Sequence, residues 1–193
     1  MARLVARLGF TRYEADEYYR IALNLYEKKN LEEAILNINS AIEMYPRRAE
    51  YYAVRGYFRL QDGLIDEPAA DFEQALTINP YEVLANYGKG VIAFNQEVFD
   101  NALQYFITAW AADSTRPDTL YYLALTYHRQ RDNVQAKQYM QQAADIYGQS
   151  AEDDRDTRKL MKNAEKWIRE FDKLIKDAEK RQKAAQATDS SSS

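Results

Sequence analysis

A period of 34 residues runs through most of the chain and limits its possible folds more than any other feature. When four consecutive 34-residue segments are aligned, each of five positions keeps one kind of side chain. The first position is small, the second is alanine except for one proline, and the third is always alanine. The fourth position is large and apolar, and the fifth is a turn residue. The columns are Ala22, Gly56, Gly90 and Ala124; Ala34, Pro68, Ala102 and Ala136; Ala41, Ala75, Ala109 and Ala143; Ile38, Phe72, Phe106 and Met140; and Pro46, Pro80, Ser114 and Gly148. Such a period indicates stacked units that each bury an apolar face against the next.

Within each segment the apolar residues predict two amphipathic helices. They recur at spacings of three and four, which places them on one face of an α-helix. In the first segment the two faces are Tyr18, Ile21, Ala22 and Leu25, and then Ala34, Ile35, Ile38, Ala41 and Ile42. Polar or turn residues, such as Asp62 and Gly63, separate the two helices of a segment. The chain is therefore predicted to be all-α and built from helical hairpins.

These residues resemble the tetratricopeptide repeat (TPR), a helical hairpin of about 34 residues. The pattern fits best between Ala15 and Pro46, which contain an aromatic residue, an apolar–small pair, two alanines and a closing proline. The resemblance covers roughly residues 12–150 and implies a right-handed α-solenoid in which the first helix of each hairpin lines a concave groove. The implied repeats are about 15–48, 49–82, 83–116 and 117–150.

Three residues depart from the family pattern. Arg55 and Lys89 occupy a position that is usually apolar, and Pro68 replaces an alanine. A long basic side chain can pack its stem and keep its charged end near the surface, so we expect Arg55 to pair with Asp71 on the adjoining helix. Proline is tolerated in a first helical turn, where its missing N–H has no intrahelical partner, so Pro68 is expected near a helix start.

In the tetratricopeptide family the groove is lined by first-helix residues one step away from the core face. The resemblance implies these groove positions: Tyr19, Leu23 and Tyr26; Ala53, Tyr57 and Leu60; Tyr87, Val91 and Phe94; and Tyr121, Leu125 and His128. All but His128 are apolar or aromatic, which favours an amphipathic helix or an apolar peptide segment as the ligand. A groove that grips a carboxylate would need charged donors, and only Arg20, Asn95 and Arg129 lie near its margin. The alternative is that these are ordinary core residues.

Residues 1–11 precede the repeats. Thr11 followed by Glu14 is a capping-box pattern, which predicts a helix start near Arg12. Three roles are open for the preceding extension: a cap packed on the array, a segment docked in the groove, or a contact with a membrane surface.

Residues 151–183 predict an amphipathic C-terminal helix. Its apolar residues recur every three or four positions, and its first half is long enough to cover the exposed end of the last hairpin. Its predicted contact residues are Trp167, Phe171, Leu174 and Ile175. They pack either on the array's own surface or on a second chain, identical or not. The small, polar tail over 184–193 is predicted to be disordered.

Charge and composition argue against several function classes. Residues 13–150 carry 12 basic and 20 acidic residues, a net charge of −8, so a nucleic-acid-binding face is not expected. Cysteine is absent, which excludes disulfides and thiolate nucleophiles. The single histidine, His128, lacks companions for a metal site or a catalytic triad, and the acids within 152–156 suit a helix N-terminus. We expect no metal, no cofactor and no enzymatic activity.

The sequence thus predicts a protein–protein interaction adaptor or scaffold. One alternative is a permanent structural or assembly subunit of a larger complex, either a soluble or a membrane-associated one. The other is a scaffold that forms a homodimer through its C-terminal helix. No apolar run approaches the ~20 residues of a membrane-spanning helix. Arg3 and Arg7 interrupt the apolar residues of the N-terminus, whereas a secretory signal has an uninterrupted apolar region. A cytoplasmic location is expected, with membrane contact only indirect or through the N-terminal segment.

Overall fold

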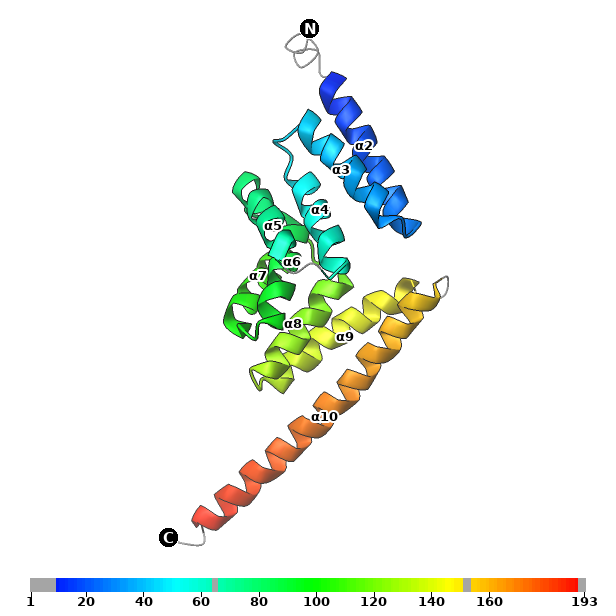
Figure 1. The fold of residues 1–193 in the computed structure, drawn as a ribbon. Helices are drawn as coiled ribbons and strands as arrows, with labels where there is room; N and C mark the ends of the chain where they lie inside the picture. Colours follow the sequence, from blue (N-terminus) through cyan, green and yellow to red (C-terminus); the bar gives the residue numbers. More distant parts are fainter. Residues whose placement is uncertain (1–9, 64–65, 151–153, 191–193) are drawn as a thin grey trace. The chain divides into compact units, whose positions relative to one another are not determined.

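The computed structural model describes residues 10–63, 66–150 and 154–190, and the regular structure within these ranges is entirely α-helical. This agrees with the predicted all-α fold. Figure 1 shows how the helices follow one another along the chain. They are α2 (Phe10–Glu27), α3 (Leu31–Met44), α4 (Ala49–Gln61), α5 (Asp66–Ile78), α6 (Val83–Asn95), α7 (Phe99–Ala112), α8 (Pro117–Arg129), α9 (Asn133–Ser150) and α10 (Arg155–Ser190).

The backbone keeps the 34-residue period of the sequence. Helices α4, α6 and α8 begin at Ala49, Val83 and Pro117, each 34 residues after the one before. A residue with left-handed φ follows the first helix of each pair: Lys29 (φ 61°), Gly63 (φ 80°), Glu97 (φ 61°) and Arg131 (φ 67°). This conformation costs a non-glycine residue about 1–2 kcal/mol, and three of these four turns nevertheless place a non-glycine residue in it.

The chain divides after Gln96 into two compact units, which we describe separately. Unit 1 contains α2 to α6. Within it, α2 packs against α3 and α4 against α5, and further contacts join α3 to α4 and α6 to both α4 and α5 (Figure 1). Each helix thus buries one face against a neighbour in the chain.

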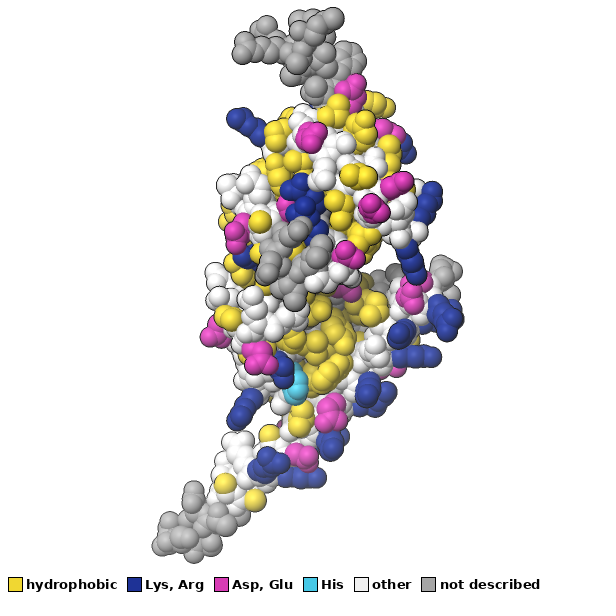
Figure 2. All heavy atoms as spheres, in the orientation of Figure 1, with side chains coloured by type: hydrophobic (Ala, Val, Ile, Leu, Met, Phe, Trp, Pro, Cys, Tyr) yellow, Lys and Arg dark blue, Asp and Glu magenta, His cyan; other side chains and the backbone are white. Residues whose placement is uncertain are grey.

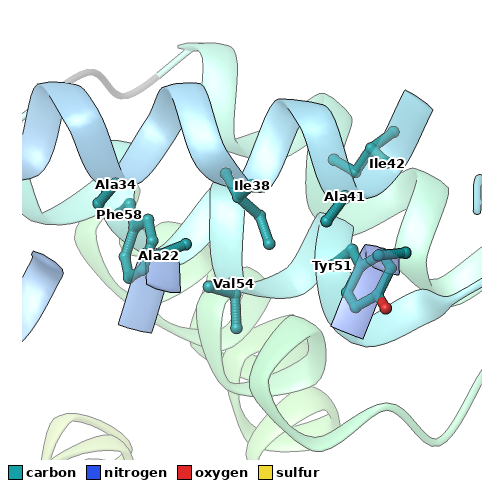
Figure 3. Close-up of a cluster of buried hydrophobic side chains, with 9 residues drawn as sticks. Ala22, Ala34, Ile38, Ala41, Ile42, Tyr51, Val54 and Phe58 are labelled. Atoms are coloured by element: carbon teal, nitrogen blue, oxygen red, sulfur yellow. The ribbon is translucent and has the colours of Figure 1, made fainter. Parts of the chain in front are cut away.

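Small residues bring the helices of unit 1 close together. Ala22, Ala34 and Ala41 are completely buried where α2, α3 and α4 meet, and the large side chains of Ile38 and Phe58 fill the adjacent space (Figure 3). An alanine has no side chain beyond Cβ, so two backbones can approach where it lies between them. The predicted columns of small and large residues therefore correspond to contacts in the core of this unit.

Two glycines accommodate the ring of Phe72, which α5 contributes to the core. A Cβ on Gly56 of α4 would lie 2.8 Å from Cε1 of Phe72, and a Cβ on Gly88 of α6 would lie 2.2 Å from its Cζ. Real Cβ atoms do not approach a ring this closely, so neither position tolerates a side chain without displacement of Phe72. The repeat columns identified Gly56 but not Gly88, which lies two residues before the small-residue position Gly90.

The basic residues that depart from the repeat pattern bind acids of α5. Arg55 donates hydrogen bonds to both carboxylate oxygens of Asp71, from Nη2 to Oδ1 at 2.5 Å and from Nε to Oδ2 at 3.0 Å. This confirms the predicted pair. Arg59, one turn later on α4, also contacts Asp71, with Nη1 to Oδ2 at 3.0 Å. From the other side, Lys89 of α6 binds Glu73 at 2.9 Å. The basic side chains therefore link α4, α5 and α6.

Unit 2 contains α7 to α10. Helix α8 contacts α7 and pairs with α9, and α10 packs along α9 (Figure 1). Ala164 and Phe171 of α10 are completely buried, together with Met140 of α9 and Ala124 of α8. The C-terminal helix thus covers the apolar face that the last hairpin would otherwise expose to water. The C-terminal part of α10 continues beyond this hairpin.

Two helix bounds differ from the prediction. Helix α2 begins at Phe10 rather than near Arg12, so Thr11 lies within the helix and is not its cap; residues 1–9 lie outside the described part. Helix α10 continues to Ser190, although 184–193 was predicted to be disordered. The prediction rested on the small and polar side chains of this segment. Alanine and glutamine, which dominate residues 184–187, favour helix even without a packed face.

Candidate partner-binding surface

The predicted groove positions lie on the first helix of each pair, and their surroundings differ between helices. On α2 and α4, all are half-buried except Ala53, which is completely buried. On α6, Tyr87 and Val91 are buried, with 8% and 7% of their surface exposed, and Phe94 is half-buried. On α8 the corresponding residues lie beneath α10. The accessible part of the predicted groove is therefore in unit 1.

Aromatic side chains of α2 and α4 meet in unit 1. The ring of Tyr26 stacks on Phe58 with centroids 4.5 Å apart and meets Tyr57 edge-on at 5.9 Å. Tyr19 lies on the same face of α2, seven residues earlier, and its ring is 5.2 Å from that of Tyr51. We call the half-buried side chains of this region the unit 1 aromatic surface; it comprises Tyr19, Leu23, Tyr26 and Tyr57. Rings held by neighbouring rings offer a firm apolar surface with hydroxyl groups at its edge.

A polar cluster at one end of this surface fixes α2 against α4. Arg48 forms an ion pair with Asp16, and the Tyr51 hydroxyl donates to the same carboxylate at 2.6 Å. The guanidinium carbon of Arg48 lies 5.1 Å from the ring centre of Tyr51 and 5.8 Å from that of Tyr19. Burial raises the pKa of the Tyr19 hydroxyl. This cluster could not be predicted from residue spacing, because Asp16 and Tyr51 are 35 residues apart.

Replacing Tyr51 by phenylalanine should make stability less sensitive to high pH. Burial, and then the hydrogen bond to Asp16, raise the Tyr51 pKa from 10.0 to about 12. A raised folded-state pKa contributes stability that is complete below about pH 10 and is lost as the pH rises through about 12. Tyr51→Phe is therefore expected to lower the free energy of unfolding by about 1–3 kcal/mol at pH 7. The difference in free energy of unfolding between wild type and variant should become smaller above about pH 10. Urea unfolding from pH 7 to above pH 10 measures this difference, and a difference that stays constant contradicts the prediction.

The groove positions of α8 are covered by the chain's own C-terminal helix. The indole Nε1 of Trp167 donates to the Tyr121 hydroxyl at 3.1 Å. The His128 ring lies 5.5 Å from Trp167 and 5.2 Å from Phe171, and Leu125 packs in the same cluster. Figure 2 shows hydrophobic side chains gathered beside the single histidine. These positions therefore bind an amphipathic helix within the same chain.

The predicted contact residues of the C-terminal helix divide between buried and half-buried positions. Phe171 is completely buried, while Trp167 and Leu174 are half-buried and pack against the cluster formed with α8 and α9. Ile175 is half-buried beside α9, where it borders a shallow hollow with Val134. In this structure these side chains therefore pack on the chain's own helices, which is one of the two arrangements that the sequence left open.

The acids near the start of α10 serve as a helix cap. The carboxylate of Asp154 accepts hydrogen bonds from the backbone N–H and the hydroxyl of Thr157, at 2.8 and 2.6 Å, and these bonds lower the pKa of Asp154. Glu152 and Asp153 lie outside the described residues. In the described part of the chain, no group of three or more histidine and acidic side chains is arranged to hold a metal ion. His128 instead bonds to Asn133, with Nδ1 and Oδ1 2.7 Å apart.

Within residues 10–63, 66–150 and 154–190, no helix combines the length and apolar character needed to cross a bilayer. The longest, α10, carries charged residues along its whole length.

Residues 15–48 match the family model described as Tetratricopeptide repeat. Solved structures with a similar fold include that of pilF from Pseudomonas aeruginosa, which is 17% identical with a TM-score of 0.62 and aligns over 91% of this chain and 89% of that one. A second is MamA 41-end from Desulfovibrio magneticus RS-1, 18% identical with a TM-score of 0.57 over 85% and 96%. A third is YrrB, described as a TPR protein with an unusual peptide-binding site, 17% identical with a TM-score of 0.55 over 86% and 88%. Identities this low show a common fold alone.

Proposed function

Since the chain is a tetratricopeptide-repeat protein, we propose that it is a cytoplasmic scaffold that binds an apolar or amphipathic segment of another protein, and that it is not an enzyme. We further propose that the four helix pairs from α2 to α9 are all repeats of this family. Folds of this kind serve protein–protein interaction, while the particular partner depends on the side chains of the site.

The unit 1 aromatic surface is the observation that carries this proposal. Tyr19, Leu23 and Tyr26 lie at spacings of four and three along α2, and the contact of Tyr26 with Tyr57 extends the surface to α4. A surface of this kind suits the apolar face of a helix, whose anchor residues also recur every three or four positions. Buried tyrosines supply large contact areas and lose little conformational freedom on binding.

Unit 2 offers an internal example of such a ligand. There α10 places Trp167 and Phe171, four residues apart, against Tyr121 and His128 of α8. Tyr121 and His128 are the repeat equivalents of Tyr19 and Tyr26, each 102 residues later in the chain. We therefore expect Tyr19 and Tyr26 to bind an amphipathic helix that carries aromatic anchor residues. YrrB, which has a similar fold, is described as having an unusual peptide-binding site.

The alternative ligand, a free carboxylate, has less support. Arg20, near the margin of the surface, is already paired with Glu17 at 2.6 Å. Arg129 in unit 2 lies 3.6 Å from Glu97. A clamp would need several convergent unpaired donors. Self-association through Trp167 and Phe171 would first require α10 to leave α8, so we favour a partner other than a second copy.

The test uses a fluorescein-labelled peptide with the sequence of residues 155–183 as a model amphipathic helix, titrated with the full-length protein. The double variant Tyr26→Ala, Tyr57→Ala should bind it at least tenfold more weakly, since central aromatic residues dominate such interfaces. The matched control is Tyr13→Ala with Tyr81→Ala, which removes two tyrosines that are 76% and 70% exposed. Thermal unfolding of each variant checks that it remains folded.

Equal affinity of the two double variants would place the binding site elsewhere. If wild type itself fails to bind the peptide, the unit 1 aromatic surface is not a helix-binding site.

A further inference from the structure

Helix α10 carries a continuous stripe of basic side chains. Between Arg155 and Lys183, nine basic residues follow one another at alternating spacings of four and three, and all are exposed. Seven of the nine are lysines. At about 100° per residue they occupy a sector of about 120° on the helix surface. Over these 28 steps the stripe is about 42 Å long, at 1.5 Å per residue.

The stripe faces away from the rest of unit 2. The opposite face of α10 holds Ala164 and Phe171, which are completely buried against the α8–α9 hairpin. Figure 2 shows lysine and arginine side chains along the outer edge of α10, away from the gathered hydrophobic side chains. A flat partner can therefore reach the whole stripe without meeting the hairpin.

Acidic residues flank the stripe on both sides. Helical spacing places Glu170 and Asp177 on one side, and Asp172 and Glu179 on the other. Asp172 is turned toward the hairpin, where it binds Lys137 of α9 at 2.6 Å. Even so, residues 155–183 carry 11 basic and 6 acidic residues, a net charge of +5. The basic charge is thus concentrated on the outermost ridge of the helix.

This arrangement distinguishes between two kinds of anionic partner. In the groove of a nucleic acid, phosphates lie on both sides of a bound helix and would meet its acidic flanks. A planar anionic surface touches only the ridge. The stripe also has no aromatic side chain on which bases could stack. Lysine, a mobile point charge, suits a fluid layer of headgroups better than a fixed bidentate site.

We propose that α10 lies flat on a membrane surface containing anionic lipids and contacts it through this basic stripe. The contact is electrostatic and superficial, because the apolar face of the helix is already used against α8 and α9. The α8–α9 hairpin then lies on the side of α10 that faces away from the lipid. This inference does not depend on the proposed function, since it involves the opposite face of the C-terminal helix.

The test is sedimentation of the full-length protein with vesicles of phosphatidylcholine, with or without about 30 mol % phosphatidylserine. The variant replaces four stripe lysines by glutamine, at Lys162, Lys166, Lys173 and Lys176. Its matched control removes four exposed basic residues elsewhere, at Arg12, Lys28, Arg47 and Arg131. Both variants change the net charge by −4, and circular dichroism compares their helix content.

We expect binding to the phosphatidylserine vesicles alone, weakened at least tenfold in the stripe variant and less than twofold in the control. Binding should also fall when the salt concentration rises from about 0.1 to about 0.5 M. Equal binding to both vesicles overturns the proposal, as does full binding by the stripe variant, which would point to another basic segment. Tighter binding to a labelled DNA duplex than to the vesicles would overturn the proposal and identify nucleic acid, rather than lipid, as the partner of the stripe.

Discussion

Asp71→Ala is expected to lower the free energy of unfolding by about 3–5 kcal/mol, because it removes the buried carboxylate shared by two arginines whose side chains are only 19% and 22% exposed. The Asp71 carboxylate is only 3% exposed and lies between the guanidinium groups of Arg55 and Arg59. Arg55 also donates to the side-chain oxygen of Asn39 at 2.8 Å, so its position is fixed from a second direction.

Urea unfolding followed by circular dichroism measures this loss. Glu43→Ala is the matched control, since Glu43 is an exposed carboxylate on the neighbouring helix α3, and its removal should change stability by less than about 0.5 kcal/mol. Replacing the whole network with apolar residues, Arg55→Met, Arg59→Met and Asp71→Leu, should cost less than Asp71→Ala alone, because no charge is left unpaired. A loss below about 1 kcal/mol for Asp71→Ala would show that the arginines are hydrated.

The Arg55–Asp71 pair was predictable because two regularities of the sequence agree on it. The repeat places Arg55 at a core position of one helix, and the amphipathic pattern places Asp71 near the core face of the next. A charged residue at a core position needs a partner of opposite sign, and the adjoining helix offered one. Repeat periodicity thus predicts helix contacts as well as the helices themselves.

Other features could not be read from the sequence because they depend on distances between packed helices. The left-handed turns at Lys29, Glu97 and Arg131 use residues with no preference for that conformation. Gly88 is required by the ring of Phe72, and its column position gives no hint of this. In both cases residue type alone is a poor guide to the local structure.

The candidate site was predictable in its chemistry but not in its accessibility. The family resemblance implied groove positions at Tyr19 and Tyr87, which are equivalent residues of two repeats. In the structure Tyr19 is half-buried on the unit 1 aromatic surface, whereas Tyr87 is 8% exposed. The same pattern left open whether Phe171 packs on its own chain. Hydrophobic spacing identifies which face of a helix is buried, but any apolar surface satisfies it, so the partner is identified only when the helices are placed in space.

The role of α10 as a cap for unit 2 leads to a second large effect. Phe171→Ala is expected to lower the stability of unit 2 by about 3–5 kcal/mol, the range typical of a large aromatic residue removed from a core. Phe171 is completely buried, and its ring lies 5.4 Å from Trp167 and 5.2 Å from His128. The cavity left behind would lie beneath the helix that covers the last hairpin, so the substitution weakens the cap as well as the core.

Trp167 provides the measurement, since its indole lies in this contact and donates to Tyr121. In a Trp110→Phe background, Trp167 fluorescence reports the unfolding of α10, and Glu170→Ala, at an exposed neighbour of Phe171, is the control. If Phe171→Ala leaves both the fluorescence transition and the stability unchanged, α10 does not cover the last hairpin in solution, and its apolar face becomes available to a second chain.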